Sequence, residues 1–132
     1  MAMVEKKRFL HLESLIAYLQ TERDGDEIFI KYKGEKIAPV EEKFFQMTDE
    51  PYRLGIEIEL DKSEKWVELE LWDYDHLTPN DSLGKFNLLV DQASENFTAT
   101  LRKEGSDARY VLNWSVIERK VKKNKSTPSS GK

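Results

Sequence analysis

Cysteine is absent from this sequence of 132 residues, and histidine occurs only twice. Without cysteine the chain can form neither a disulfide framework nor a thiolate metal site, and it has no thiol nucleophile. Two histidines are too few for a histidine-rich metal centre. Any metal site must therefore be built from oxygen atoms, chiefly those of acidic side chains.

The sequence also lacks a long hydrophobic run. The longest uninterrupted apolar stretch spans residues 15–19, far below the ~20 residues that cross a bilayer, and residues 1–8 contain no apolar signal core. We therefore expect no transmembrane segment and a cytoplasmic location. The six glycines are scattered singly, so a glycine-rich phosphate loop is excluded.

Charge is distributed unevenly along the chain. The formal net charge is −4, but residues 9–118 carry 24 acidic and 12 basic side chains, whereas residues 119–132 carry six basic side chains and no acid. We expect a polar N-terminal segment (1–8), one folded domain (9–118) and a basic, disordered tail (119–132). Nucleic-acid-binding proteins normally carry their basic surface on the folded domain, so the acidic body indicates that nucleic acid is not the partner.

Apolar and polar residues alternate in several segments, which is the pattern of half-buried antiparallel strands. The clearest examples are 54–60 and 66–72, and we expect these two strands to pair through the polar turn between them. Residues 10–20 have apolar residues at helical spacing and could instead form a helix. The full set of expected strands is 9–19, 27–33, 36–39, 54–60, 66–72, 83–90, 97–102 and 109–118. Their regular spacing predicts an all-β sandwich or barrel.

An acidic loop follows the strand at 66–72. Asp73 and Asp75 lie two residues apart at a strand end, which predicts that both project to the same side, and the turn at 78–80 can fold Asp81 back toward them. A second acidic turn contains Asp24 and Asp26. Converging carboxylates suit Ca²⁺, which takes about six to eight oxygen ligands in flexible geometry, better than they suit Mg²⁺. The simpler explanation is a solvated acidic turn whose aspartates cap local backbone amides.

An EF-hand loop beginning at Asp73 is excluded. Such a loop needs glycine at its sixth position and glutamate at its twelfth, whereas Thr78 and Gly84 stand there. The flanking segments also alternate as strands, whereas an EF-hand needs helices on both sides.

The sequence Leu-Trp-Asp-Tyr-Asp at 71–75, followed by Asn-Asp-Ser-Leu-Gly-Lys-Phe at 80–86, resembles the third calcium loop of a C2 domain. The spacing of Asp73, Asp75 and Asp81 matches that family's pattern, and Asp26 before an alternating strand is similar to its first loop. The resemblance covers roughly residues 9–118. It implies an eight-stranded antiparallel C2-like β-sandwich in which Ca²⁺ sits between loops at one end and bridges the domain to anionic lipid or a protein partner.

The first loop departs from the family pattern, because Gln20 stands six residues before Asp26, where a second aspartate is usual. Glu22 or Asp24 could replace that ligand. A first loop this short looks more like the small C2-like modules of bacterial proteins.

Two functions follow from the sequence and the resemblance. The first is a non-enzymatic, calcium-responsive C2-like module that contacts a membrane surface or a protein partner through its acidic loops, with the metal held by Asp24, Asp26, Asp73, Asp75 and Asp81. The alternative is a calcium-independent structural or adaptor β-sandwich.

Two further features bear on a membrane partner. Lys31, Lys33 and Lys36 place three cations near one strand face, which would suit lipid phosphates, although a solvated polar face explains them more simply. Leu77 at the apex of the acidic loop could enter a membrane interface, but one leucine supplies only ~1.5 to 3 kcal/mol if fully buried, too little alone.

Overall fold

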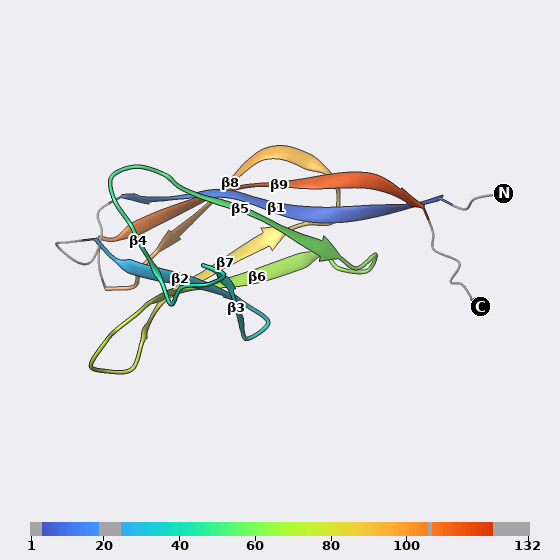
Figure 1. The fold of residues 1–132 in the computed structure, drawn as a ribbon. Coiled ribbons are helices and arrows are strands. Elements are labelled where there is room, and N and C mark those ends of the chain that lie inside the picture. Colours follow the sequence, from blue (N-terminus) through green and yellow to red (C-terminus); the bar gives the residue numbers. More distant parts are fainter. Residues whose placement is uncertain (1–3, 19–24, 106, 123–132) are drawn as a thin grey trace, which may run out of the picture.

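The protein forms two antiparallel β-sheets in the computed structural model, which describes residues 4–18, 25–105 and 107–122. Sheet A has the strand order β5-β1-β9-β8, and sheet B has the order β3-β2-β6-β7, with β4 paired to β2. Figure 1 shows the two sheets as the layers of a sandwich. The strands are β1 (Val4–Tyr18), β2 (Glu27–Tyr32), β3 (Glu35–Ala38), β4 (Phe45–Gln46), β5 (Tyr52–Leu60), β6 (Trp66–Asp73), β7 (Asp81–Leu89), β8 (Ser94–Arg102) and β9 (Arg109–Lys122).

The predicted all-β class is confirmed, since the described ranges contain nine strands and no helix. Each of the eight predicted strands is present, and the ninth is the two-residue β4. No helix in these ranges is long and apolar enough to span a membrane.

The helical alternative for residues 10–20 is wrong for the part that the structure describes, because β1 runs to Tyr18. A β-bulge between Leu12 and Ser14 shifts the register of β1 against both of its neighbours. Leu12 and Leu15 are therefore both fully buried although they lie three residues apart. One extra residue in a strand produces this local helix-like spacing of apolar side chains.

The predicted hairpin of 54–60 with 66–72 is also wrong. β5 pairs with β1 in sheet A, whereas β6 pairs with β2 and β7 in sheet B. The turn at 61–65 therefore connects the two sheets (Figure 1). Alternation shows only that one face of each strand is buried. Two strands that face each other from opposite sheets of a sandwich bury those faces as well as two strands paired in one sheet do.

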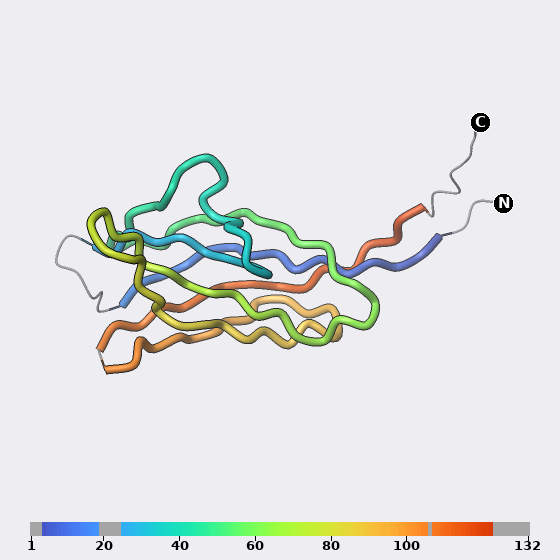
Figure 2. Tube along the Cα trace, turned by 90° about the horizontal axis from the view of Figure 1, so that it is seen from below, coloured from blue at the N-terminus to red at the C-terminus, as the bar shows by residue number. Residues whose placement is uncertain are grey.

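Sheet A extends beyond the domain boundaries expected from the sequence. Val4 pairs with Lys122, and the strands remain in register through Arg8 and Glu118. Residues 4–8 and 119–122 are thus strand rather than polar segment and disordered tail, and the remaining residues of those two segments lie outside the described ranges. The ends of β1 and β9 project together past the rest of the sandwich (Figure 2).

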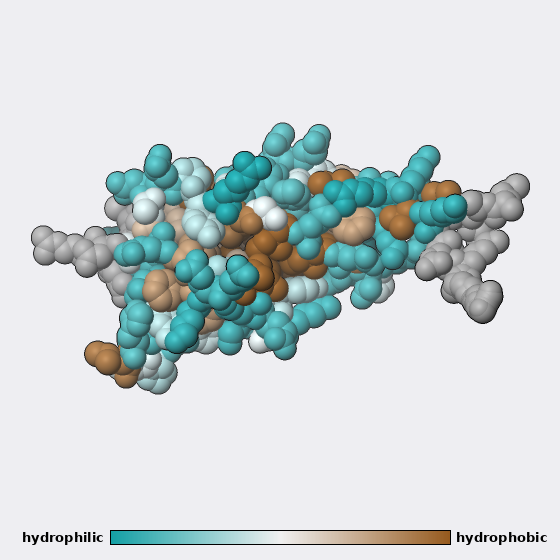
Figure 3. All heavy atoms as spheres, in the orientation of Figure 1, coloured by the Kyte–Doolittle hydropathy of each residue, from teal (hydrophilic) through white to brown (hydrophobic). Residues whose placement is uncertain are grey.

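The core lies between the sheets and consists mainly of aliphatic side chains from both of them. β7 and β8 contact each other along one side of the sandwich. On the other side, β5 is an edge strand whose apolar side chains are half-buried, and Figure 3 shows apolar surface between the layers. The β6–β7 loop and the β8–β9 turn lie at the end of the sandwich opposite the projecting strands (Figures 1 and 2). We call this the loop end.

Candidate functional site

Asp26 and Asp73 are the buried carboxylates at the loop end, with 0% and 7% of their surfaces exposed, and no other charged side chain in the described ranges is buried. Asp26 accepts a hydrogen bond at Oδ2 from the hydroxyl of Tyr110 in β9. Asp73 accepts one at Oδ1 from the backbone amide of Glu27, at 3.1 Å. The end of β6 is thereby fixed against the start of β2, beside Asp26.

Asp75 does not share the environment of Asp73. β6 ends at Asp73, and Asp75 is exposed in the following loop. Its Oδ1 accepts hydrogen bonds from the backbone amides of Leu77 (3.0 Å) and Thr78 (3.2 Å). A side-chain hydrogen bond from Thr78, and then these two amides, hold the pKa of Asp75 below its usual range. The carboxylate therefore stabilises its own turn, as aspartates commonly do in loops.

Asp81 stands directly opposite Asp73 where the connecting loop closes the β6–β7 hairpin. The hairpin thus returns Asp81 toward Asp73, but the Asp81 side chain is exposed and its Oδ2 lies 3.7 Å from Nζ of Lys103. The remaining predicted ligand, Asp24, lies outside the described residues. Within the described ranges, no three acidic or histidine side chains are grouped so that they could hold a metal ion.

An aromatic cluster covers the base of the acidic loop. Phe44 stacks on Tyr74 with ring centroids 5.1 Å apart, and His76 meets both rings edge-on. His76 Nε2 also lies 3.2 Å from Oε2 of Glu27. The sequence analysis missed this cluster, because Phe44 lies 30 residues from Tyr74 and outside any alternating segment.

A basic and aromatic surface lies on the outer face of sheet B. Lys31 in β2 stands opposite Lys36 in β3, and its Nζ lies 5.2 Å from the ring centroid of Trp72 and 6.0 Å from that of Phe29. The two rings stack at 6.1 Å. Lys33, in the β2–β3 turn, lies over Tyr32 at 5.1 Å. Tyr32 packs against the core, so Lys33 is not counted with the outer-face residues. We call Lys31 and Lys36, with Trp72 and Phe29, the basic face.

Two glutamates lie near the basic face without neutralising all of it. Glu70 stands opposite Lys31, but its Oε1 accepts a hydrogen bond from Trp72 Nε1 at 2.9 Å. Glu64 lies 3.9 Å from Nζ of Lys33. Among the described residues, Lys31 and Lys36 form no ion pair with a carboxylate. The positive charges of Lys31 and Lys36 are therefore not balanced by a carboxylate there, although Lys36 Nζ donates a hydrogen bond to the backbone carbonyl of Glu42.

Comparison with known proteins adds no family to this description. No protein-family model matches the chain, and no curated protein matches it in sequence.

Proposed function

We propose that this chain is a C2-like β-sandwich without catalytic activity, and that it binds an anionic membrane surface through its basic face without needing calcium. The observation that carries the proposal is the pairing of Lys31 with Lys36 beside the stacked rings of Trp72 and Phe29. Ammonium groups bind lipid phosphates, and tryptophan rings favour the boundary between headgroups and acyl chains.

The acidic loop supports the proposal through its exposed apex. Leu77 is 95% exposed, and Figure 3 shows apolar surface at the tip of this loop. The loop and the β2–β3 turn project to the same side of the sandwich in Figure 1. A membrane that meets the basic face can therefore also receive Leu77.

Simple energetics indicate a weak, salt-sensitive contact. A lysine near an anionic bilayer contributes roughly 1 kcal/mol, so Lys31 and Lys36 supply about 2 kcal/mol at low ionic strength. Full burial of Leu77 adds roughly 1.5 to 3 kcal/mol. Neither contribution alone gives firm attachment, so both are needed.

The partners of the acidic side chains support independence from calcium. Leu77 and Thr78 donate to Asp75, Lys103 lies beside Asp81, and Tyr110 donates to Asp26. The protein itself thus supplies positive partners or donors at positions where a C2-like calcium site would present oxygen atoms to the metal.

Vesicle sedimentation in the presence of EDTA tests the proposal. The full chain should bind phosphatidylcholine vesicles that contain phosphatidylserine, and not vesicles of phosphatidylcholine alone. Lys31→Gln with Lys36→Gln should weaken binding about 30-fold, since about 2 kcal/mol is lost. Lys62→Gln with Lys65→Gln, which removes the same charge from the 61–65 turn, is the matched control and should have little effect. An equal loss of vesicle binding in both double variants would show non-specific electrostatic attraction. If the chain does not bind the vesicles in EDTA, a protein partner becomes the better hypothesis.

Calcium binding is the second candidate, and the burial of Asp26 and Asp73 at neighbouring backbone positions favours it. Two buried carboxylates repel each other, and a dication relieves that repulsion. At a concentration a hundredfold above its Kd, Ca²⁺ would stabilise the fold by ~2.7 kcal/mol, which raises the Tm by several degrees.

Thermal melting in Ca²⁺, Mg²⁺ and EDTA separates the two candidates. If calcium is bound, Ca²⁺ raises the Tm more than Mg²⁺ does, and Asp73→Asn with Asp75→Asn abolishes the shift. Asp91→Asn, an exposed acid outside the loop, is the control and should retain it. An unchanged Tm at millimolar Ca²⁺ favours the calcium-independent module.

A further inference from the structure

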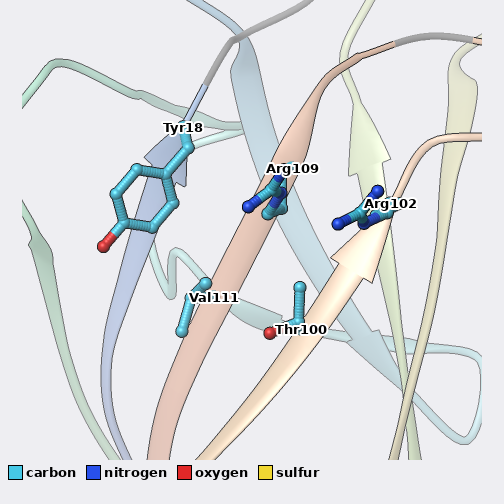
Figure 4. Close-up of a pocket in the computed structure, with 5 residues that line it drawn as sticks. All are labelled: Tyr18, Thr100, Arg102, Arg109 and Val111. Carbon is cyan, nitrogen blue, oxygen red and sulfur yellow. The ribbon is translucent and has the colours of Figure 1, made fainter.

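Two arginines stand directly opposite each other on the outer face of sheet A. Arg102 ends β8 and Arg109 begins β9, and the two are register partners beside the turn that joins these strands. Arg109 is also the register partner of Tyr18 in β1. Tyr18, Arg109 and Arg102 therefore form a row across three strands, and Figure 4 shows the three side chains on the same face.

Within the described ranges, neither arginine has an acidic partner. Some other cations of the sandwich lie near carboxylates, as Arg119 does with Glu57 and Lys103 with Asp81. Arg102 and Arg109, by contrast, form no ion pair or hydrogen bond with any residue that the structure describes. The Nε of Arg109 is shielded from solvent and has no hydrogen-bond partner there. Like charges directly opposite each other destabilise a strand pair, so this arrangement is not explained by the stability of the sheet.

The arginines line an open pocket of about 750 Å³. Its other lining residues within the described ranges are Tyr18, Thr100 and Val111, and none of the described lining residues is acidic. In Figure 4 the Tyr18 ring forms one wall, Val111 lies on β9 between Tyr18 and Thr100, and Thr100 sits below the guanidinium groups. The pocket thus combines two planar donor groups, the hydroxyls of Thr100 and Tyr18, and an apolar side.

We infer that this pocket binds a phosphate monoester. A guanidinium presents its N–H groups as a fork that matches phosphoryl oxygens, and two forks offer two positive charges to a dianion. The hydroxyl of Thr100 supplies a further donor, and Tyr18 with Val111 can pack against the organic group that carries the phosphate. A singly charged carboxylate or sulfate ester would leave one of the two positive charges unbalanced. The pocket lies on sheet A, so this inference does not depend on the basic face of sheet B or on calcium.

Titration of the full chain with phenyl phosphate, followed by amide NMR and calorimetry, tests the inference. Phenyl phosphate should bind with submillimolar Kd and shift the amide signals at the β8–β9 end. Phenyl sulfate and benzoate should bind at least tenfold more weakly. Arg102→Gln and Arg109→Gln should each weaken binding at least tenfold, and Arg109→Lys, which keeps the charge but not the fork, should also weaken it. Arg53→Gln, on the opposite edge strand of the same sheet, is the control and should bind as the unmodified chain does.

A melting experiment keeps the test independent of folding defects. Phenyl phosphate should raise the Tm of the unmodified chain but not that of Arg102→Gln, whose own Tm should be unchanged or higher because the repulsion is relieved. Vesicles containing phosphatidic acid, a lipid with a monoester phosphate, identify the source of the ligand. If the chain binds these vesicles and Arg102→Gln weakens that binding, the phosphate belongs to a lipid headgroup. If the chain binds phenyl phosphate but Arg102→Gln does not weaken its binding to the vesicles, the phosphate belongs to a soluble compound. Equal affinity for benzoate and phenyl phosphate, or full affinity in a variant that combines Arg102→Gln with Arg109→Gln, overturns the inference.

Discussion

The hydroxyl of Tyr110 donates a hydrogen bond to Oδ2 of Asp26, and both side chains are completely buried. The two residues lie 84 positions apart in the chain. Tyr110 belongs to sheet A, and Asp26 directly precedes the first strand of sheet B. This hydrogen bond therefore connects the two layers of the sandwich at the loop end.

We expect Tyr110→Phe to destabilise the fold by about 1 to 3 kcal/mol, because a buried carboxylate loses a donor that water cannot replace. The midpoint of urea unfolding measures the loss. Tyr18→Phe is the matched control, since that side chain is 50% exposed and its hydroxyl can reach water. Similar midpoints for the two variants would show that the buried hydrogen bond adds nothing to stability.

A pH titration tests the turn at Asp75. The pKa of this carboxyl is held below its usual range, first by the hydroxyl of Thr78 and then by the amides of Leu77 and Thr78. Because the folded pKa is the lower one, the charged carboxylate favours the folded turn above the unfolded pKa, and this contribution is lost as pH falls through the folded pKa. We expect Thr78→Val to raise the pKa of Asp75 toward its ordinary value, as measured by carboxyl-carbon NMR. Thr78→Ser keeps the hydroxyl and should retain the low pKa, so a common pKa in both variants contradicts the assignment.

Shortening the chain tests the projecting part of sheet A. Arg119 forms a bidentate ion pair with Glu57, at 2.6 and 2.8 Å, and its guanidinium lies 4.9 Å from the ring centroid of Phe9. An exposed ion pair contributes roughly 0.2 to 1 kcal/mol and an exposed cation–π contact roughly 0.5 to 1 kcal/mol. We therefore expect a chain ending at Glu118 to melt about 5 °C lower than the full chain.

Two controls isolate the contribution of Arg119. A chain ending at Lys122 keeps every pair that β9 makes and should melt within about a degree of the full chain. Arg119→Gln in the full chain should reproduce most of the loss. A chain ending at Glu118 that melts like the full chain would show that the projecting strand ends do not stabilise the sandwich.

Gly84 is the fourth site for a test. Its φ is +127°, and a Cβ placed there would lie 3.2 Å from both δ carbons of Leu101 in the neighbouring layer. We expect Gly84→Ala to destabilise the fold by about 1 to 3 kcal/mol through backbone strain and crowding of the core. Gly34→Ala, with φ +81° and no atom within 4 Å of the added carbon, has backbone strain alone and should be milder. Equal urea midpoints would mean that Leu101 moves aside.

The strands were predictable from the sequence because their signal is local. Alternation needs only neighbouring residues, and it located strands at each of the eight expected positions. Strand pairing was harder to predict, because burial of one face does not identify the neighbouring strand. The 61–65 turn is the example, since it connects the two sheets and does not close the predicted hairpin. The hydrogen bond between Tyr110 and Asp26 could not be predicted, since the local sequence around either residue gives no information about a contact 84 positions away.

The acidic loop was predictable in its placement but less so in its geometry. The hairpin does bring Asp81 opposite Asp73. The expectation that Asp73 and Asp75 project to the same side assumed that the strand continues, and β6 ends at Asp73. Beyond that residue the local hydrogen bonds of an aspartate turn decide where the carboxylate points.

The adjacent ends of β1 and β9 determine how the domain responds to mechanical force. Val4 and Lys122 are partners at the same end of an antiparallel pair, so a pull that separates them acts along the hydrogen bonds between the strands. Such a load breaks the hydrogen bonds between β1 and β9 one after another, beginning at the projecting end. A sandwich loaded in this way yields at low force, whereas the same sheet pulled along its strands would have to break many bonds together.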